Sequence, residues 1–133
     1  MEPSVRILVV DDEVLIGHSV EDALQESGYS VCLAHSGADA ISVLDGAKGS
    51  IVGLVTDIRM GNGPDGWDVG RRARELDAFM PVVYMSGDSA SDHSSRGVPD
   101  SVMVQKPFVG AQIVTAISQL LNAIPQHSAD RSS

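Results

Sequence analysis

Short apolar segments rich in β-branched residues alternate along this chain with segments of helical periodicity, and this alternation most constrains the fold. The first, Val5–Val10, is apolar at nearly every position, which is typical of a strand buried on both faces of a parallel sheet. Further strands are predicted at residues 30–34, 51–56, 81–85 and 102–105. Because a helical or polar segment follows each one, we expect five β-α units and a parallel sheet covered by helices on both faces.

The helical segments differ in how clearly the sequence predicts them. The first has apolar residues at helical spacing and ends at Gly28, and the last, 109–124, has the apolar face Ile113, Ile117, Leu120, Leu121 and Ile124. Two more are predicted at 38–44, stopped by Gly46 and Gly49, and at 67–76. Residues 86–100 are polar and contain two glycines and a proline, so the fourth helix should be short or frayed.

Length and charge limit the class of protein. A chain of 133 residues fits one domain, which we place at residues 5–124, followed by a polar tail at 125–133 that we expect to be disordered. A net charge of −9 repels phosphate backbones and argues against direct nucleic-acid binding. The single cysteine, Cys32, and the lack of a leader or apolar span predict a cytoplasmic protein away from the membrane.

Polar residues follow four of the predicted strands, where ligands bind in open α/β sheets. They are Asp11 and Asp12, Asp57, Ser86 and Lys106. Each has an ordinary structural interpretation by itself: a helix cap, a turn residue or a surface lysine. Their coincidence at one sheet edge instead predicts a single site.

The chemistry of such a site is specific. Close carboxylates repel each other unless a cation joins them, and Mg²⁺ takes one or two carboxylates together with phosphate oxygens. Lys106 offers a point charge for phosphate and Ser86 a hydroxyl donor. An aspartate can act as the nucleophile and form an acyl phosphate. These residue types therefore indicate phosphoryl transfer.

Four stretches resemble the signatures of two-component receiver domains: Val9–Glu13, Val55–Met60, Met85–Gly87 and Lys106–Phe108. The resemblance covers about residues 5–122 and implies a flavodoxin-like (βα)5 fold with strand order 2-1-3-4-5. It implies that Asp57 accepts the phosphoryl group, that Ser86 is the hydroxyl switch and that Lys106 pairs with the phosphate. It implies a Mg²⁺ site made by the side chains of Asp11, Asp12 and Asp57 and the backbone carbonyl of Arg59. It also implies a cis bond between Lys106 and Pro107.

The implied function is a phosphoacceptor switch. A histidine kinase or phosphotransfer protein would donate to Asp57, the protein would act on no outside substrate, and output would pass through protein contacts. Alternatives are a phosphorylation-independent interaction module on the same fold, the receiver piece of a hybrid histidine kinase, an aspartate-nucleophile phosphatase and a flavodoxin-like redox protein. The last should carry a phosphate-binding loop after the first strand, where this chain has acids.

Three features depart from the family pattern or add to it. Met103 stands where the family often has an aromatic switch residue, and we interpret it as flexible strand filling. Arg59 and Asp88 each lie two positions after a site residue, so we expect that they could pair across the mouth and hinder hydrolytic water. The outer face of the last helix is uncharged, which favours a partner or homodimer surface; its residues are Gln112, Thr115, Ser118, Gln119 and Asn122.

Overall fold

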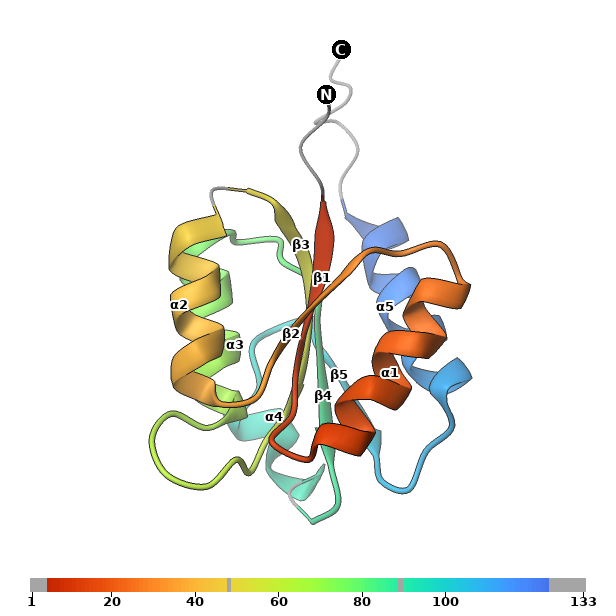
Figure 1. Ribbon diagram of the computed structural model, residues 1–133. Helices are drawn as coiled ribbons and strands as arrows, with labels where there is room; N and C mark the ends of the chain where they lie inside the picture. The colour runs from red at the N-terminus through yellow and green to blue at the C-terminus, as the bar shows by residue number, and fades with distance from the viewer. Residues whose placement is uncertain (1–4, 48, 89, 125–133) are drawn as a thin grey trace.

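The structure, a computed structural model, describes residues 5–47, 49–88 and 90–124, so the predicted tail lies outside the described residues. Five parallel strands form one sheet in the order β2-β1-β3-β4-β5 (Figure 1). The strands are β1 Arg6–Val10, β2 Val31–Ala34, β3 Ile51–Asp57, β4 Val82–Ser86 and β5 Val102–Gln105. The predicted flavodoxin-like fold and its strand order are confirmed.

Helices cover both faces of the sheet (Figure 1). On one face lie α1 (Val14–Glu26) and α5 (Gly110–Ala123), and on the other lie α2 (Gly37–Ala47) and α3 (Gly66–Leu76). The fourth crossover has only a 3-10 turn, Ala90–Asp92, and the four-residue helix α4, His93–Arg96, so the short fourth helix is confirmed. Among the described helices, none has the length and apolar character needed to cross a bilayer.

The sheet divides the hydrophobic core into two layers. Along β1, Ile7 and Val9 pack toward α1 and α5, whereas Leu8 and Val10 pack toward α2 and α3. All four side chains are fully buried. Because successive side chains point to opposite faces of a strand, burial on both faces demands the uninterrupted apolar run of the sequence.

Element ends agree with the predictions except in a few places. Gly28 lies just beyond α1 with a φ of 96°, as expected of a glycine that closes a helix. The prediction that Gly46 stops α2 is wrong, because the helix runs through it to Ala47. One exposed glycine costs a helix only about 1 kcal/mol, and Gly49, with a φ of 89°, lies in the turn that follows. β3 ends one residue later than predicted, at Asp57, and β4 is shifted by one residue to Val82–Ser86. Asp57 and Ser86 are therefore the last residues of their strands.

The outer face of α5 matches the prediction at four of its five positions. Gln112, Thr115, Gln119 and Asn122 are exposed. Ser118 is half-buried instead, because its hydroxyl lies 2.7 Å from the hydroxyl of Tyr29 in a hydrogen bond.

Candidate functional site

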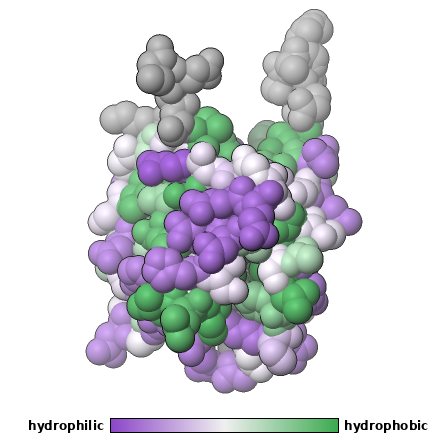
Figure 2. All heavy atoms as spheres, turned by 45° about the vertical axis from the view of Figure 1, so that its right-hand side comes forward, coloured by the Kyte–Doolittle hydropathy of each residue, from purple (hydrophilic) through white to green (hydrophobic). Residues whose placement is uncertain are grey.

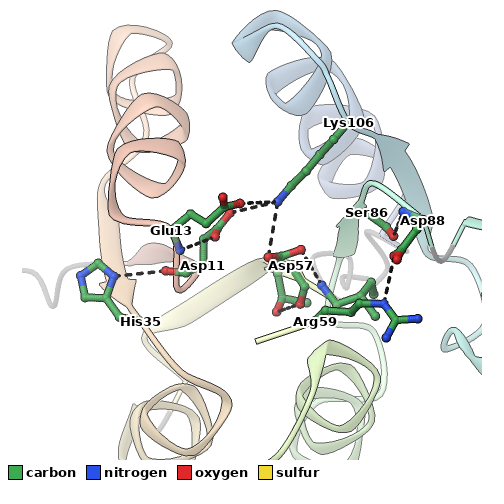
Figure 3. A network of polar contacts seen from close by, with 10 residues as sticks. Asp11, Glu13, His35, Asp57, Arg59, Ser86, Asp88 and Lys106 are labelled. Carbon is green, nitrogen blue, oxygen red and sulfur yellow. Dashed lines mark hydrogen bonds and ion pairs between the residues drawn. The ribbon is translucent and has the colours of Figure 1, made fainter. Parts of the chain in front are cut away.

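The carboxyl ends of four strands carry the polar residues predicted for one site. Asp57 ends β3 and Ser86 ends β4, while Asp11 and Lys106 directly follow β1 and β5. Figure 3 shows the side chain of Lys106 reaching across to Asp11 and Asp57, with Ser86 on the neighbouring strand. The bond between Lys106 and Pro107 is cis, as expected.

Three carboxylates form an acidic cluster. Oxygens of Asp11, Asp12 and Asp57 all lie within 4.8 Å of one another. Asp11 is fully buried and Asp57 is 6% exposed, whereas Asp12 faces solvent. Asp11 Oδ1 accepts a hydrogen bond from the backbone N–H of Glu13 at 2.8 Å, and Asp57 Oδ1 accepts one from that of Ile58 at 2.9 Å. Asp11 Oδ2 is buried and has no hydrogen-bond partner among the described residues, so the cluster retains an unsatisfied acceptor.

Burial and mutual repulsion perturb the ionisation of the cluster. Burial, followed by the negative charge of Asp11, raises the pKa of Asp57 to about 6. Burial also raises the pKa of Asp11. The positive charge of Lys106 opposes both shifts without cancelling them. Three carboxylates face one ammonium, so the ionised cluster carries more negative charge than Lys106 neutralises, which is the condition that favours a bound cation.

Lys106 stands among three carboxylates. Its Nζ lies 3.4 Å from Asp57 Oδ2, 3.7 Å from Asp11 Oδ2 and 3.3 Å from Glu13 Oε1. The lysine side chain is only 18% exposed. Its partial burial works against the charged form, but the carboxylates, Asp57 first, outweigh it and raise the pKa of Lys106. The ammonium therefore stays protonated beside Asp57.

Ser86 and the rim complete the site. Ser86 is almost fully buried, and its Oγ accepts a hydrogen bond from the backbone N–H of Asp88 at 3.2 Å. The predicted pair is present across the mouth, where Arg59 Nε lies 2.9 Å from Asp88 Oδ1 (Figure 3). Both partners are more than 60% exposed, so the ion pair adds little to stability. Its position over the mouth is what makes it relevant to the site.

Close backbone packing supports the end of β3. The N–H of Gly66, at the start of α3, donates to the carbonyl of Ile58 at 2.8 Å. A Cβ on Gly66 would lie 2.1 Å from the backbone oxygen of Asp57, so only glycine fits there. Asp65 caps α3, because its side chain accepts a hydrogen bond from the backbone N–H of Asp68 at 3.0 Å. In turn, the side chain of Asp68 accepts one from the backbone N–H of Asp65 at 3.0 Å. The helix start is thereby held against the strand that ends in Asp57.

Sequence reasoning missed two residues at this site. No residue of the loop after β2 is among the predicted site residues, yet His35 Nδ1 donates to the backbone oxygen of Asp11 at 3.2 Å. Glu13 was not assigned a role, although it makes the shortest of the three contacts to Lys106. A third acid directly after Asp11 and Asp12 was the only signal for Glu13, and nothing local signalled His35.

The fold and the arrangement of acids, hydroxyl and amine at one sheet edge define a receiver-type α/β domain. A family model for the response regulator receiver domain matches residues 7–118. The chain therefore belongs to the response regulator receiver domain family. Receiver domains bind Mg²⁺ at an acidic pocket, and the family consists of regulatory domains rather than conventional enzymes.

Known proteins agree with this assignment. The crystal structure of a response regulator receiver protein from Sinorhizobium medicae WSM419 is 49% identical, with a TM-score of 0.86 over 90% of this chain and 96% of that one. The transcriptional regulatory protein TrcR of Mycobacterium tuberculosis is 33% identical over 88% of this chain and 45% of its own length. The response regulator MprA of Mycobacterium bovis is 34% identical over 89% and 51%. The chain thus spans about half the length of the curated relatives it matches.

Proposed function

We propose that the protein is a phosphoacceptor switch of two-component signal transduction and that Asp57 takes up the phosphoryl group. One observation carries this proposal: the Lys106 ammonium lies 3.4 Å from a nearly buried aspartate whose neighbours are two further carboxylates. Phosphoryl transfer depends on positioning and charge neutralisation more than on covalent help from other groups. A buried carboxylate nucleophile flanked by an ammonium supplies both.

The proposed transfer starts from a phosphohistidine on a histidine kinase or phosphotransfer protein. A carboxylate oxygen of Asp57 attacks the phosphorus, the P–N bond breaks, and its electron pair returns to the imidazole nitrogen, which takes up a proton. The product is an aspartyl phosphate. Since the pKa of Asp57 is about 6, the attacking carboxylate is mostly ionised at neutral pH. In this proposal, Lys106 and the hydroxyl of Ser86 contact the phosphoryl oxygens.

The residues present fit a divalent cation. Asp11 Oδ2 is buried without a hydrogen-bond partner in the described part of the chain, and Asp12 and Asp57 add oxygens within 4.8 Å. Hard oxygen donors of this kind suit Mg²⁺. We assign the ion to the side chains of Asp11, Asp12 and Asp57 and to the backbone carbonyl of Arg59. When bound, it would neutralise charge on the transferring group.

The donor is proposed to dock on the apolar rim beside Lys106. Figure 2 shows hydrophobic surface at the lower end of the face that α1 and α5 form, and the exposed apolar side chains at this end include Val14, Leu15 and Val109. A shallow pocket of about 460 Å³ lies there, lined by Leu15, Ile16, Ser19, Lys106, Pro107 and Phe108. A protein that brings phosphohistidine to Asp57 must cover this rim.

Output is proposed to pass through protein contacts of the α5 face. The groove between α5 and the edge strand β5 is lined by uncharged residues, among them Met103, Gln112 and Gln119. Phosphorylation adds about −1.5 to −2 charges at the site, which can shift a two-state surface. A downstream protein or a second copy would occupy the groove. The mass of the phosphorylated protein in solution separates a homodimer from a monomer that awaits another partner.

Incubation with Mg²⁺ and a small acyl phosphate, followed by mass spectrometry, tests the phosphoacceptor proposal. We expect a gain of one phosphoryl group that disappears in Asp57→Asn and persists in Asp22→Asn, an exposed position on α1. Absence of the gain in the unaltered protein would favour a phosphorylation-independent interaction module. Turnover of outside phosphate esters would favour a phosphatase.

Two further points belong to the proposal. We place the exchange in the cytoplasm, because the single free cysteine, Cys32, fits a reducing compartment. A receiver within a hybrid histidine kinase would use the same site, and detection of this sequence fused to a kinase core in the native protein would favour that arrangement.

A further inference from the structure

Lys106 has a carboxylate partner that stands outside the acidic cluster. Figure 3 shows Glu13 and Asp57 meeting the ammonium from two sides. The contact with Glu13 Oε1 measures 3.3 Å, slightly shorter than the 3.4 Å contact with Asp57 Oδ2. The possible metal cluster among the described residues comprises Asp11, Asp12 and Asp57 and leaves Glu13 out. Glu13 can therefore hold the ammonium without serving the cation.

The local structure around Glu13 does not by itself explain where its side chain points. Glu13 occupies the N-cap position of α1, yet within the described chain its side chain makes no capping hydrogen bond. A capping side chain typically contributes about 1 kcal/mol to a helix. The Glu13 side chain instead reaches a lysine 93 positions away. Its backbone N–H is already used, because it donates to Asp11 Oδ1.

We propose that Glu13 is a positioning residue for Lys106, an inference that rests on the proposed function. A lysine ammonium sits on a flexible four-carbon stem and needs partners to stay in one place. When the oxygens of Asp11 and Asp57 face a cation and a phosphoryl group, Glu13 is the carboxylate that remains for the ammonium. It keeps Lys106 at the position where the phosphoryl oxygens arrive.

The negative charge of Glu13 has a second effect that must be separated from positioning. An anionic phosphodonor approaches more easily when a nearby carboxylate is removed. This effect changes the donor concentration that gives half the maximal rate, and it does not need Lys106. Positioning changes the maximal rate and operates only when Lys106 is present. Since the Glu13 side chain is 61% exposed, its ion pair contributes little to folding stability, and Glu13→Gln should leave the fold intact.

A double-mutant cycle on the full chain tests the inference. The rate of phosphorylation by acetyl phosphate at saturating Mg²⁺ is followed by mass spectrometry over a range of donor concentrations. The variants are Glu13→Gln, Lys106→Met and their combination. We expect Glu13→Gln to lower the maximal rate about threefold to tenfold with Lys106 present and less than about twofold in the Lys106→Met background.

The matched control is Glu26→Gln, which removes the same charge near the other end of α1, about 20 Å along the helix. It should leave the maximal rate unchanged. Equal factors in both lysine backgrounds, or no fall with Lys106 present, would overturn the positioning role. A loss of Mg²⁺ affinity of about tenfold or more in Glu13→Gln would overturn it too, because Glu13 would then act on the metal. An unaltered protein that takes up no phosphoryl group at all would refute the proposed function itself and with it this inference.

Discussion

Asp57→Asn should make the metal-free protein more stable at neutral pH, although it removes the residue on which the proposed function depends. The pKa of Asp57 is about 6 in the folded chain, against an ordinary value of 3.8. A rise of about two units, at about 1.4 kcal/mol per unit, corresponds to a cost of about 3 kcal/mol for ionising this carboxyl in the folded protein. Asparagine keeps an oxygen for the N–H of Ile58 and carries no charge.

The pH dependence follows from the direction of the shift. Between about pH 4 and pH 6 the folded state binds more protons at Asp57 than the unfolded state does, so this group lowers the free energy of unfolding as pH rises. The advantage of Asp57→Asn should therefore be near zero at pH 4 and reach about 1 to 3 kcal/mol at pH 7. Saturating Mg²⁺ should reduce the advantage, because a cation that binds only the folded state stabilises the unaltered protein.

Urea unfolding in the presence of a chelator measures this effect, with the fluorescence of Trp67 as the signal. Trp67 is the single tryptophan and is 1% exposed, so it reports loss of the core. The control Asp22→Asn, at an exposed position, should change stability by less than about 0.5 kcal/mol. If Asp57→Asn were no more stable than the unaltered protein at pH 7, or if its advantage were as large at pH 4, burial and repulsion at Asp57 would not be the cause.

Three other predictions follow from the structure. Gly66→Ala should destabilise the fold by about 3 kcal/mol in urea unfolding, because the new Cβ would meet the backbone oxygen of Asp57. Gly46→Ala, at an exposed position inside α2, should instead raise the free energy of unfolding by up to about 1 kcal/mol. Tyr84→Phe should cost about 1 to 2 kcal/mol in the same assay, since the N–H of Val98 loses its bond to the Tyr84 hydroxyl; an unchanged midpoint would mean that water replaces it. Arg59→Ala should speed loss of the phosphoryl group about twofold to fivefold, as expected for removal of an exposed ion pair, while the control Arg71→Ala on α3 should not. If mass spectrometry gave equal rates of loss for Arg59→Ala and the unaltered protein, the pair with Asp88 would not shield the site.

Most of the fold, and which residues lie together at the site, could be predicted from local patterns in the sequence. Short apolar runs identify strands buried on both faces, and parallel strands place their carboxyl ends at one sheet edge. A residue that follows such a run, as Asp11 and Lys106 do, must therefore lie at that edge. The weak fourth helix was predictable for a similar local reason, because its segment has too few apolar residues to bury.

Contacts between distant segments could not be read from those patterns. Tyr29 and Ser118 are 89 positions apart, and their hydrogen bond turns Ser118 away from the outer face of α5 to which the helical period assigned it. The bond between Tyr84 and Val98 likewise depends on Gly70, whose missing side chain leaves room for the tyrosine hydroxyl. Such contacts depend on how each helix is rotated against the sheet.

The sequence by itself determined the strand order, through its resemblance to a known family. It also determined which chemical groups meet at one sheet edge, because the length of a strand and the polar residues at its end are local properties of the chain. Only the tertiary structure decided what each group does there. Asp11 and Asp12 are neighbours in sequence, yet one is fully buried and the other exposed. Glu13 faces Lys106 instead of capping its own helix. Burial and charge pairing depend on the packing of several elements at once, which no local pattern encodes.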